Sequence, residues 1–222
     1  MIPFKLFVMK HFMKKIAAIV LGVSFGTLAF AGNPFQGTIK FTKTIGPITA
    51  NYTYYVKGDK IRVEELSETG EIQGIMIVDT KENTVRALSP ERNMFIDVPN
   101  KRPARETEVY VQKTTNKKTI NGYECTEVKV TGKDDGREVT FWAADDQFDF
   151  MIPMLETLNR KDKLAVYFMN IPNFEGTFPM VGIEKKTDGV ELTKLQVVSV
   201  NKTDLSNDLF VIPSNYSKFE RE

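Results

Sequence analysis

Cys125 is the only cysteine of the 222-residue chain and the first side chain to consider for chemistry. It lies in the stretch INGYECTEVKV, residues 120–130, and could be a reactive thiol, half of an intermolecular disulfide or a small apolar strand residue. A thiol becomes reactive beside a cation or a histidine, whereas Lys129 stands four residues farther along the predicted strand. We therefore predict that Cys125 is a mostly buried strand residue, with an intermolecular disulfide as the alternative.

Adjacent carboxylates are the second candidate for chemistry, as acid–base pairs or as metal ligands. The pairs are Glu64 with Glu65, Asp134 with Asp135, and Asp145 with Asp146. Because adjacent side chains point apart, the pairs lack the geometry of a glycosidase acid and base. The Asp134 pair lies in a glycine-flanked turn without the spaced oxygen ligands of a calcium loop. We predict that the Asp145 pair caps a helix and that the Glu64 pair lies on a strand surface.

The N-terminal stretch has the parts of a secretory signal peptide. From Met13 it reads MKKIAAIVLGVSFGTLAFAGN, with two lysines, an uncharged apolar run over residues 16–30 and small residues where signal peptidase reads. The apolar run is shorter than the roughly 20 residues of a transmembrane helix. We predict that residues 1–31 form a signal peptide cleaved between Ala31 and Gly32, that the natural start is Met13, and that the protein is exported.

Removal of that segment leaves a chain without histidine, because His11 is the only one. Without histidine there is no Ser-His-Asp or Cys-His catalysis and no histidine-ligated zinc. The other 191 residues carry 26 basic and 29 acidic side chains, a net charge of −3, which gives no reason to propose nucleic acid as a partner. We expect a protein that is not an enzyme and that uses no cofactor and no metal.

Short alternating segments fill most of the remaining chain. Phe35, Ile39 and Phe41 alternate with polar residues, which is the period of a half-buried strand. Further strands are predicted at residues 51–56, 61–66, 72–78, 84–88, 94–98, 107–115, 123–131, 137–142, 181–186 and 191–200. Turn residues separate them, including Asn121-Gly122, a strong hairpin signal. The pattern predicts a mainly β, antiparallel sandwich or barrel of about ten strands.

One apolar segment breaks this period. Residues 144–161 carry apolar side chains at helical spacing, and Pro153 either kinks the helix or stands in its first turn. Residues 164–182 are apolar but interrupted by two prolines and a glycine. The segment is rich in methionine, which suits surfaces that adapt to varied apolar partners. We predict that residues 148–180 either cover an apolar cavity as a lid or fill the core. The candidate ligand-binding residues are Phe148, Met151, Met154, Leu155, Leu158, Phe168, Met169, Phe174 and Met180.

Several fragments, in this order, resemble a known family. They read FQGTIKF, YYVKGDKIRVE, IVDTKENTVRALSPERNMF, TINGYEC, FWAAD and LFVIPSNY. The pattern resembles the domain of unknown function 4412, a family of exported bacterial proteins, over roughly residues 35–219. That family is similar in layout to the periplasmic lipoprotein carriers of the Lol system. The resemblance implies a single domain over residues 35–219, a curved and incomplete antiparallel β-barrel with helices covering its open side, and a periplasmic location in a Gram-negative cell.

Two functions are compatible with these observations. The first is a periplasmic binding protein with an apolar cavity for a lipid or acyl ligand, covered by segment 148–180. The second is a non-enzymatic structural or interaction protein of the cell envelope with a packed interior. The expected partners are accordingly a lipid or acyl ligand, an envelope protein and, through peripheral contact, the membrane.

Overall fold

The computed structural model describes residues 33–99 and 107–220. The predicted signal peptide, residues 1–31, and its cleavage site between Ala31 and Gly32 lie outside these residues. Within the described part of the chain, no helix has the length and apolar character needed to cross a membrane.

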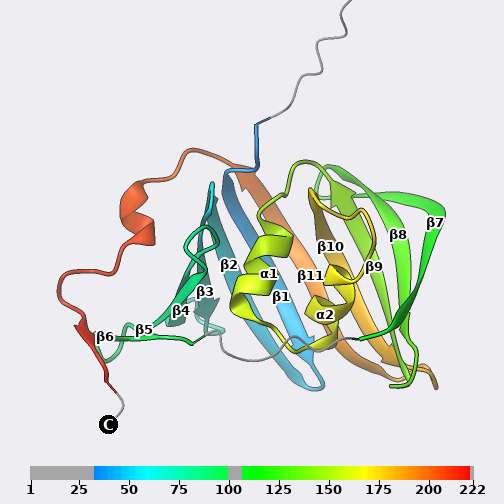
Figure 1. The fold of residues 1–222 in the computed structure, drawn as a ribbon, viewed down its shortest axis with the longest axis horizontal. Helices are drawn as coiled ribbons and strands as arrows, with labels where there is room; N and C mark the ends of the chain where they lie inside the picture. Colours follow the sequence, from blue (N-terminus) through cyan, green and yellow to red (C-terminus); the bar gives the residue numbers. More distant parts are fainter. Residues whose placement is uncertain (1–32, 100–106, 221–222) are drawn as a thin grey trace, which may run out of the picture. The chain divides into compact units, whose positions relative to one another are not determined.

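One sheet of twelve strands makes up most of the described chain (Figure 1). The strands are β1 (Gly37–Ile45), β2 (Ile48–Lys57), β3 (Lys60–Leu66), β4 (Ile72–Asp79), β5 (Thr84–Ser89), β6 (Met94–Asp97), β7 (Val109–Ile120), β8 (Tyr123–Gly132), β9 (Arg137–Asp145), β10 (Thr177–Lys186), β11 (Glu191–Lys202) and β12 (Ser217–Lys218). Their order across the sheet is β12-β6-β5-β4-β3-β2-β1-β11-β10-β9-β8-β7. Neighbouring strands run antiparallel, except that β12 pairs with β6 in parallel.

The predicted fold class is confirmed. The chain is mainly β, and its antiparallel sheet is not closed into a barrel, because the two edge strands, β12 and β7, do not pair with each other. Twelve strands are present where about ten were expected. The pattern did not predict β12, because a strand of two residues is too short to show alternation.

The hairpin predicted at Asn121-Gly122 joins β7 to β8. Both residues have positive φ, 49° and 84°, as a two-residue hairpin turn of this type requires. The side-chain amide of Asn121 also donates a hydrogen bond of 3.0 Å to the main-chain oxygen of Val197. The turn therefore reaches β11, which lies three strands away from β8 in the sheet order.

Two short helices, α1 (Met151–Leu158) and α2 (Lys163–Met169), lie on one face of the sheet (Figure 1). Helix α1 contacts β4 and β5, whereas α2 contacts β9 and β10. The two helices thus bridge two distant parts of the curved sheet. Pro153 stands in the first turn of α1, where its missing N–H costs no helical hydrogen bond.

The predicted capping of a helix by Asp145 or Asp146 is wrong. Helix α1 begins only after Phe150, whose side chain makes no capping hydrogen bond. Asp145 is the last residue of β9, and Asp146 pairs with Lys202 at 2.8 Å. The alternation of β9 continues farther than expected, so the predicted helix over residues 144–161 is too long. Helix α2 was not predicted, because its seven residues are apolar almost throughout and show no helical period.

The main hydrophobic core lies between the two helices and the sheet. Strand β4 shows how the alternation divides its side chains: Met76 and Val78 belong to this core, whereas Ile75 and Ile77 belong to a second, smaller cluster. The second cluster also contains Leu88, Phe95, Ile212 and Tyr216. Its C-terminal members come from the segment that follows the 3₁₀ helix η1 (Asn207–Phe210). Both faces of β4 are therefore covered.

Candidate functional site

The nine residues predicted to bind a ligand belong to one hydrophobic cluster. Seven of them are buried in the main core: Phe148, Met151, Met154, Leu155, Phe168, Phe174 and Met180. The other two, Leu158 and Met169, are partly buried and pack against it. The structure thus brings the whole predicted set together between the helices and the sheet.

A cavity of about 50 Å³, here called the central cavity, lies within this cluster. Three of the nine predicted residues, Met151, Leu155 and Phe168, line it from the helical side, and the other six do not line it but belong to the core or pack against it. The sheet and α2 contribute further apolar lining residues, which include Phe41, Val63, Phe141, Leu164, Ala165 and Leu195. Since roughly 10–15 Å³ is enough for one water molecule, the central cavity holds a few waters at most. In this conformation, segment 148–180 fills most of the interior.

Charged side chains stand at one end of the central cavity. The carboxylate of Asp162 lies 3.2 Å from Nζ of Lys43 and 3.7 Å from Nε of Arg160. Asp162 is held in place because its Oδ1 accepts a hydrogen bond from the backbone N–H of Ala165, which makes it the N-cap of α2. We call Lys43, Arg160 and Asp162 the mouth cluster. It gives an otherwise apolar cavity one polar end.

Two tyrosines connect the mouth cluster to the apolar wall. Tyr52 stacks on Phe41 with a ring-centroid distance of 5.2 Å, and Tyr54 meets the same ring edge-on at 4.7 Å. Burial raises the pKa of Tyr54 to about 12. Burial, and after it the nearby carboxylate of Glu65, raises the pKa of Tyr52. Both hydroxyl groups therefore stay protonated at neutral pH, and that of Tyr52 is hydrogen-bonded to Glu65.

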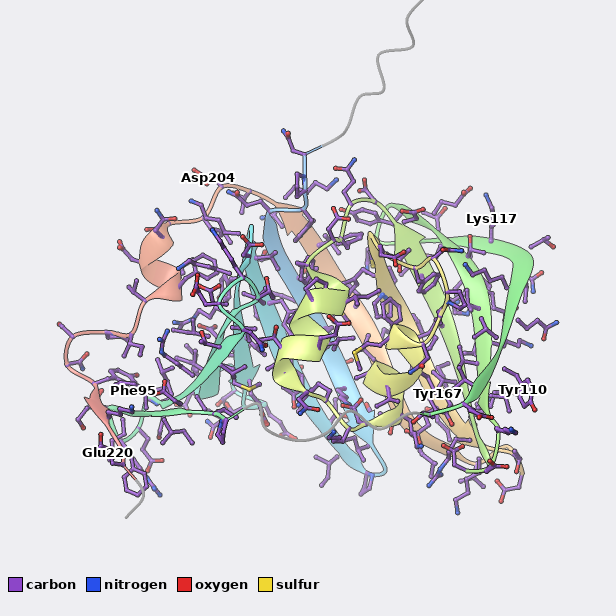
Figure 2. All side chains as sticks on the ribbon, viewed as in Figure 1. Phe95, Tyr110, Lys117, Tyr167, Asp204 and Glu220 are labelled. Atoms are coloured by element: carbon purple, nitrogen blue, oxygen red, sulfur yellow. The ribbon has the colours of Figure 1, made fainter. Side chains whose placement is uncertain are left out.

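A second polar cluster holds α2 on its other side. The hydroxyl of Tyr167 donates to both carboxylate oxygens of Asp135, at 2.6 and 2.7 Å, and the ammonium of Lys163 pairs with the same carboxylate. We call these three residues the Asp135 anchor; Tyr167 lies on α2 and is fully buried (Figure 2). Burial and the Asp135 carboxylate raise the pKa of Tyr167. Gly132 leaves the space for this contact, because a Cβ atom there would lie 2.0 Å from the Tyr167 hydroxyl.

Cys125 has a structural environment, as predicted. Its side chain is fully buried and unpaired with another cysteine, and its Sγ lies 3.5 Å from the main-chain oxygen of Tyr123. Burial raises the pKa of the thiol, which disfavours the reactive thiolate. The prediction of a buried strand residue is confirmed.

Glu64, which was predicted to lie on a strand surface, is buried, so this prediction is wrong. Its carboxylate lies 2.7 Å from Nη2 of Arg62 and accepts a hydrogen bond of 3.1 Å from the hydroxyl of Tyr55. Arg62 in turn donates to a main-chain carbonyl of η1, whose segment covers this face of β3. The Asp134 pair lies in the expected turn, where Asp135 forms the anchor. Within residues 33–99 and 107–220, no three or more side chains form a metal-binding group.

The mouth cluster was not among the predicted site residues, although the sequence held one signal for it. Lys43 continues the inward alternation of Ile39 and Phe41 on β1, and a lysine at an inward position needs an anionic partner. Arg160 and Asp162 lie in the short connection between α1 and α2, and only the fold brings them to β1.

Fold and cavity together define a class of protein: an open antiparallel sheet whose inner face is covered by two short helices around a small apolar cavity with a charged mouth. The chain belongs to the family described as a domain of unknown function (DUF4412), whose model matches residues 35–216. The predicted family is therefore confirmed. Among curated proteins, none matches the chain.

Several solved structures are similar to this chain at low identity. An uncharacterized conserved protein from Thermus thermophilus is 14% identical with a TM-score of 0.49, over 83% of this chain and 89% of that one. A chain in the MucA/MucB complex of Pseudomonas aeruginosa is 14% identical with a TM-score of 0.47, over 82% of this chain and 56% of that one. A putative outer membrane lipoprotein-sorting protein domain from Vibrio parahaemolyticus is 10% identical with a TM-score of 0.34, over 78% of this chain and 87% of that one.

Proposed function

We propose that the protein is an exported, periplasmic binding protein that takes up a lipid or another acyl ligand between its two helices and the inner face of the sheet. The binding domain is residues 35–219, and the signal peptide is residues 1–31. The central cavity carries this proposal, because its lining is apolar except at the mouth cluster and the two tyrosines beside it. That division matches a ligand with a long apolar part and one polar end.

An acyl chain needs more room than the central cavity offers, so ligand entry requires segment 148–180 to move. Ligand pockets usually measure about 300–1,000 Å³, against about 50 Å³ here. Helix α1 has no side-chain N-cap, no acidic residue in its first turn and no basic residue in its last. Packing rather than intrinsic helix stability therefore holds α1 in place. An entering acyl chain replaces the apolar contacts that α1 gives up, and flexible methionines adapt to the new packing.

Native mass spectrometry of the full-length protein, purified gently from the periplasm, tests the proposal. We expect a fraction of the protein to carry an acyl-containing molecule, which extraction and lipid analysis then identify. The purified protein is also expected to take up tetradecanoic acid or tetradecanol. The proposal is overturned if no acyl molecule co-purifies and the purified protein takes up neither compound.

A cavity-filling variant tests the location of the ligand. Ala165 is buried in α2 and lines the central cavity, so Ala165→Leu fills space that the ligand needs. We expect acyl uptake to fall about tenfold, which corresponds to about 1.4 kcal/mol. Ala87→Leu is the matched control, because Ala87 lies on β5, none of whose residues lines the central cavity. Equal uptake by the two variants would place the ligand elsewhere.

A second candidate function, an interaction protein of the envelope, is favoured by one surface feature. Ile45, Ile48 and Val190 are 56%, 71% and 52% exposed. They lie at two neighbouring hairpin turns that a hydrogen bond from Gly46 N–H to the Leu192 carbonyl connects at 3.2 Å. Clustered exposed aliphatic side chains are typical of contact sites for proteins or membranes. A photo-crosslinker at position 48 tests this in cells: one recurrent protein adduct, absent with the crosslinker at position 40, supports it, and equal labelling from both positions contradicts it.

A further inference from the structure

The mouth cluster has more positive than negative charge at the end of an apolar cavity. Asp162 is the one carboxylate that forms ion pairs with Lys43 and Arg160 among the described residues, so two cations share a single anion. The Lys43 side chain is only 12% exposed. A cation that has lost most of its water needs strong anionic contacts in compensation. A carboxylate that Lys43 shares with Arg160 compensates the Lys43 ammonium only in part.

The position of Lys43 indicates what else it contacts. Lys43 follows Ile39 and Phe41 on the inward side of β1 and pairs in register with Leu195 of β11. Its ammonium therefore stands at the boundary between the apolar lining and the carboxylate of Asp162. The inward side chains of β1 thus change from apolar, at Ile39 and Phe41, to charged, at Lys43. An acyl ligand changes in the same order from its apolar chain to its polar head group.

We infer that the mouth cluster recognises the anionic head group of an acyl ligand, with Lys43 and Arg160 as the residues that contact the anion. This inference rests on the proposed function. On ligand binding the head group takes over the contacts of Lys43 and Arg160 from the Asp162 carboxylate, which keeps its hydrogen bond to the start of α2. Tyr54 also lines the central cavity, and its hydroxyl group is a further donor.

The chemistry of the two cations sets the class of head group. A guanidinium donates in a planar fork that fits carboxylate and phosphate oxygens, and an ammonium acts as a compact point charge. A neutral alcohol offers neither cation a charge to replace that of Asp162. The site therefore prefers a fatty acid or a phosphate monoester that carries an acyl chain over an alcohol of equal chain length.

A competition assay against one fluorescent acyl probe tests the inference with the full-length protein. The competitors are tetradecanoic acid, tetradecanol and the lysophosphatidic acid of the same chain length. For the unmodified protein, we expect whichever of the two anions binds more tightly to compete about tenfold better than the alcohol, a difference of about 1.4 kcal/mol in binding free energy. The ratio between the two anions tells a carboxylate site from a phosphate site.

Variants connect this preference to named residues. Lys43→Met and Arg160→Gln are expected to bring the ratio of anion to alcohol close to one while tetradecanol still binds. Lys43→Arg keeps the charge and is expected to keep the preference, which separates recognition from damage to the fold. Lys40→Met is the matched control, because Lys40 lies on the same strand with its side chain exposed and outside the cavity lining.

The outcomes separate this inference from the proposed function. If tetradecanol and the anions compete equally with the unmodified protein, head-group recognition is overturned and acyl binding stands. Head-group recognition is also overturned, with acyl binding intact, if Lys43→Met and Arg160→Gln both keep the full preference. If none of the three compounds competes, the proposed function fails and the inference fails with it.

Discussion

Helix α2 is held at two places that differ in chemistry. At the mouth cluster, charged groups pair at 3.2 and 3.7 Å, and the side chains of Arg160 and Asp162 are 38% and 35% exposed. At the Asp135 anchor, a fully buried hydroxyl donates to a carboxylate at 2.6 and 2.7 Å. Exposed ion pairs contribute about 0–1 kcal/mol, whereas hydrogen bonds to charged groups contribute about 1.5–3 kcal/mol. We therefore expect the Asp135 anchor to stay intact when the mouth cluster exchanges its anion.

The largest effect is expected from crowding the Asp135 anchor. In Gly132→Ala, the new Cβ would lie 2.0 Å from the Tyr167 hydroxyl and 2.1 Å from Oδ1 of Asp135, so the two groups must separate. Overpacking of this kind costs about 1–3 kcal/mol, and we expect the upper end because a buried hydrogen bond is also lost. Urea unfolding measures the change. Gly74→Ala is the control, because no atom lies within 4 Å of a Cβ there; a similar loss in both variants would contradict the crowding of the anchor.

Removal of the hydroxyl alone is expected to have a smaller effect. Tyr167→Phe keeps the buried ring and deletes the donor, while Asp135 retains the Lys163 ammonium and the backbone N–H of Arg137. The expected loss is about 1–2 kcal/mol of unfolding free energy. Tyr110→Phe removes a hydroxyl from an exposed residue of β7 (Figure 2) and is expected to stay within about 0.5 kcal/mol. Indistinguishable midpoints for the two variants would show that the anchor hydrogen bond is not stabilising.

The pH dependence of stability probes the same anchor more gently. Burial raises the pKa of Asp135, but the hydrogen bonds from Lys163 and Tyr167 outweigh this, so the pKa lies below its ordinary value. A lowered pKa in the folded state means that the carboxylate stabilises the fold above the ordinary pKa of about 3.9, and that this contribution disappears as the pH falls through the folded-state pKa. A protonated carboxyl can still accept from Tyr167, so only part of the anchor is lost.

Unfolding free energies of the unmodified protein and Asp135→Asn, measured between neutral pH and pH 2, check this expectation. The difference between the two proteins should be constant near neutral pH and should shrink below about pH 4, where the unfolded state of the unmodified protein binds a proton that the folded state does not yet bind. Asp134→Asn, the neighbouring carboxylate in the same turn, is the control. A difference that does not change with pH would assign the effect of the substitution to shape rather than charge.

Alternation predicted most of the sheet, because the inward and outward side chains of strands such as β1 and β9 differ in polarity. It failed where both faces of an element are covered. Glu64 is polar and buried because η1 covers the outer face of β3, and no local pattern announces a cover that is far away in the sequence. Helix α2 is apolar almost throughout for the same reason, since it packs on β9 and β10 and also contacts α1.

The candidate site also has a part that local sequence patterns predict and a part that they do not. Its apolar members could be predicted, because methionine and phenylalanine accumulate in one segment of the sequence. Its charged members could not, because Lys43 comes from β1 and meets Arg160 and Asp162 only through the fold. The one local sign was Lys43, an inward lysine on an otherwise apolar face of β1. It predicts an anionic partner, because a buried ammonium needs an anion.

The sharpest test of the comparison between the mouth cluster and the Asp135 anchor comes from Asp162→Asn. Asparagine caps a helix about as well as aspartate, so the variant removes the charge of the mouth cluster and keeps the start of α2. We expect a stability loss of about 1–3 kcal/mol, because the Lys43 side chain is only 12% exposed and its ammonium loses its anionic partner. Because Lys43 and Arg160 then have no carboxylate to give up, tetradecanoic acid should bind more tightly, by about fivefold, which corresponds to about 1 kcal/mol, and tetradecanol should be unaffected. Weaker binding of the acid would mean that Asp162 helps to hold the ligand, and the exchange of anions at the mouth cluster would be wrong.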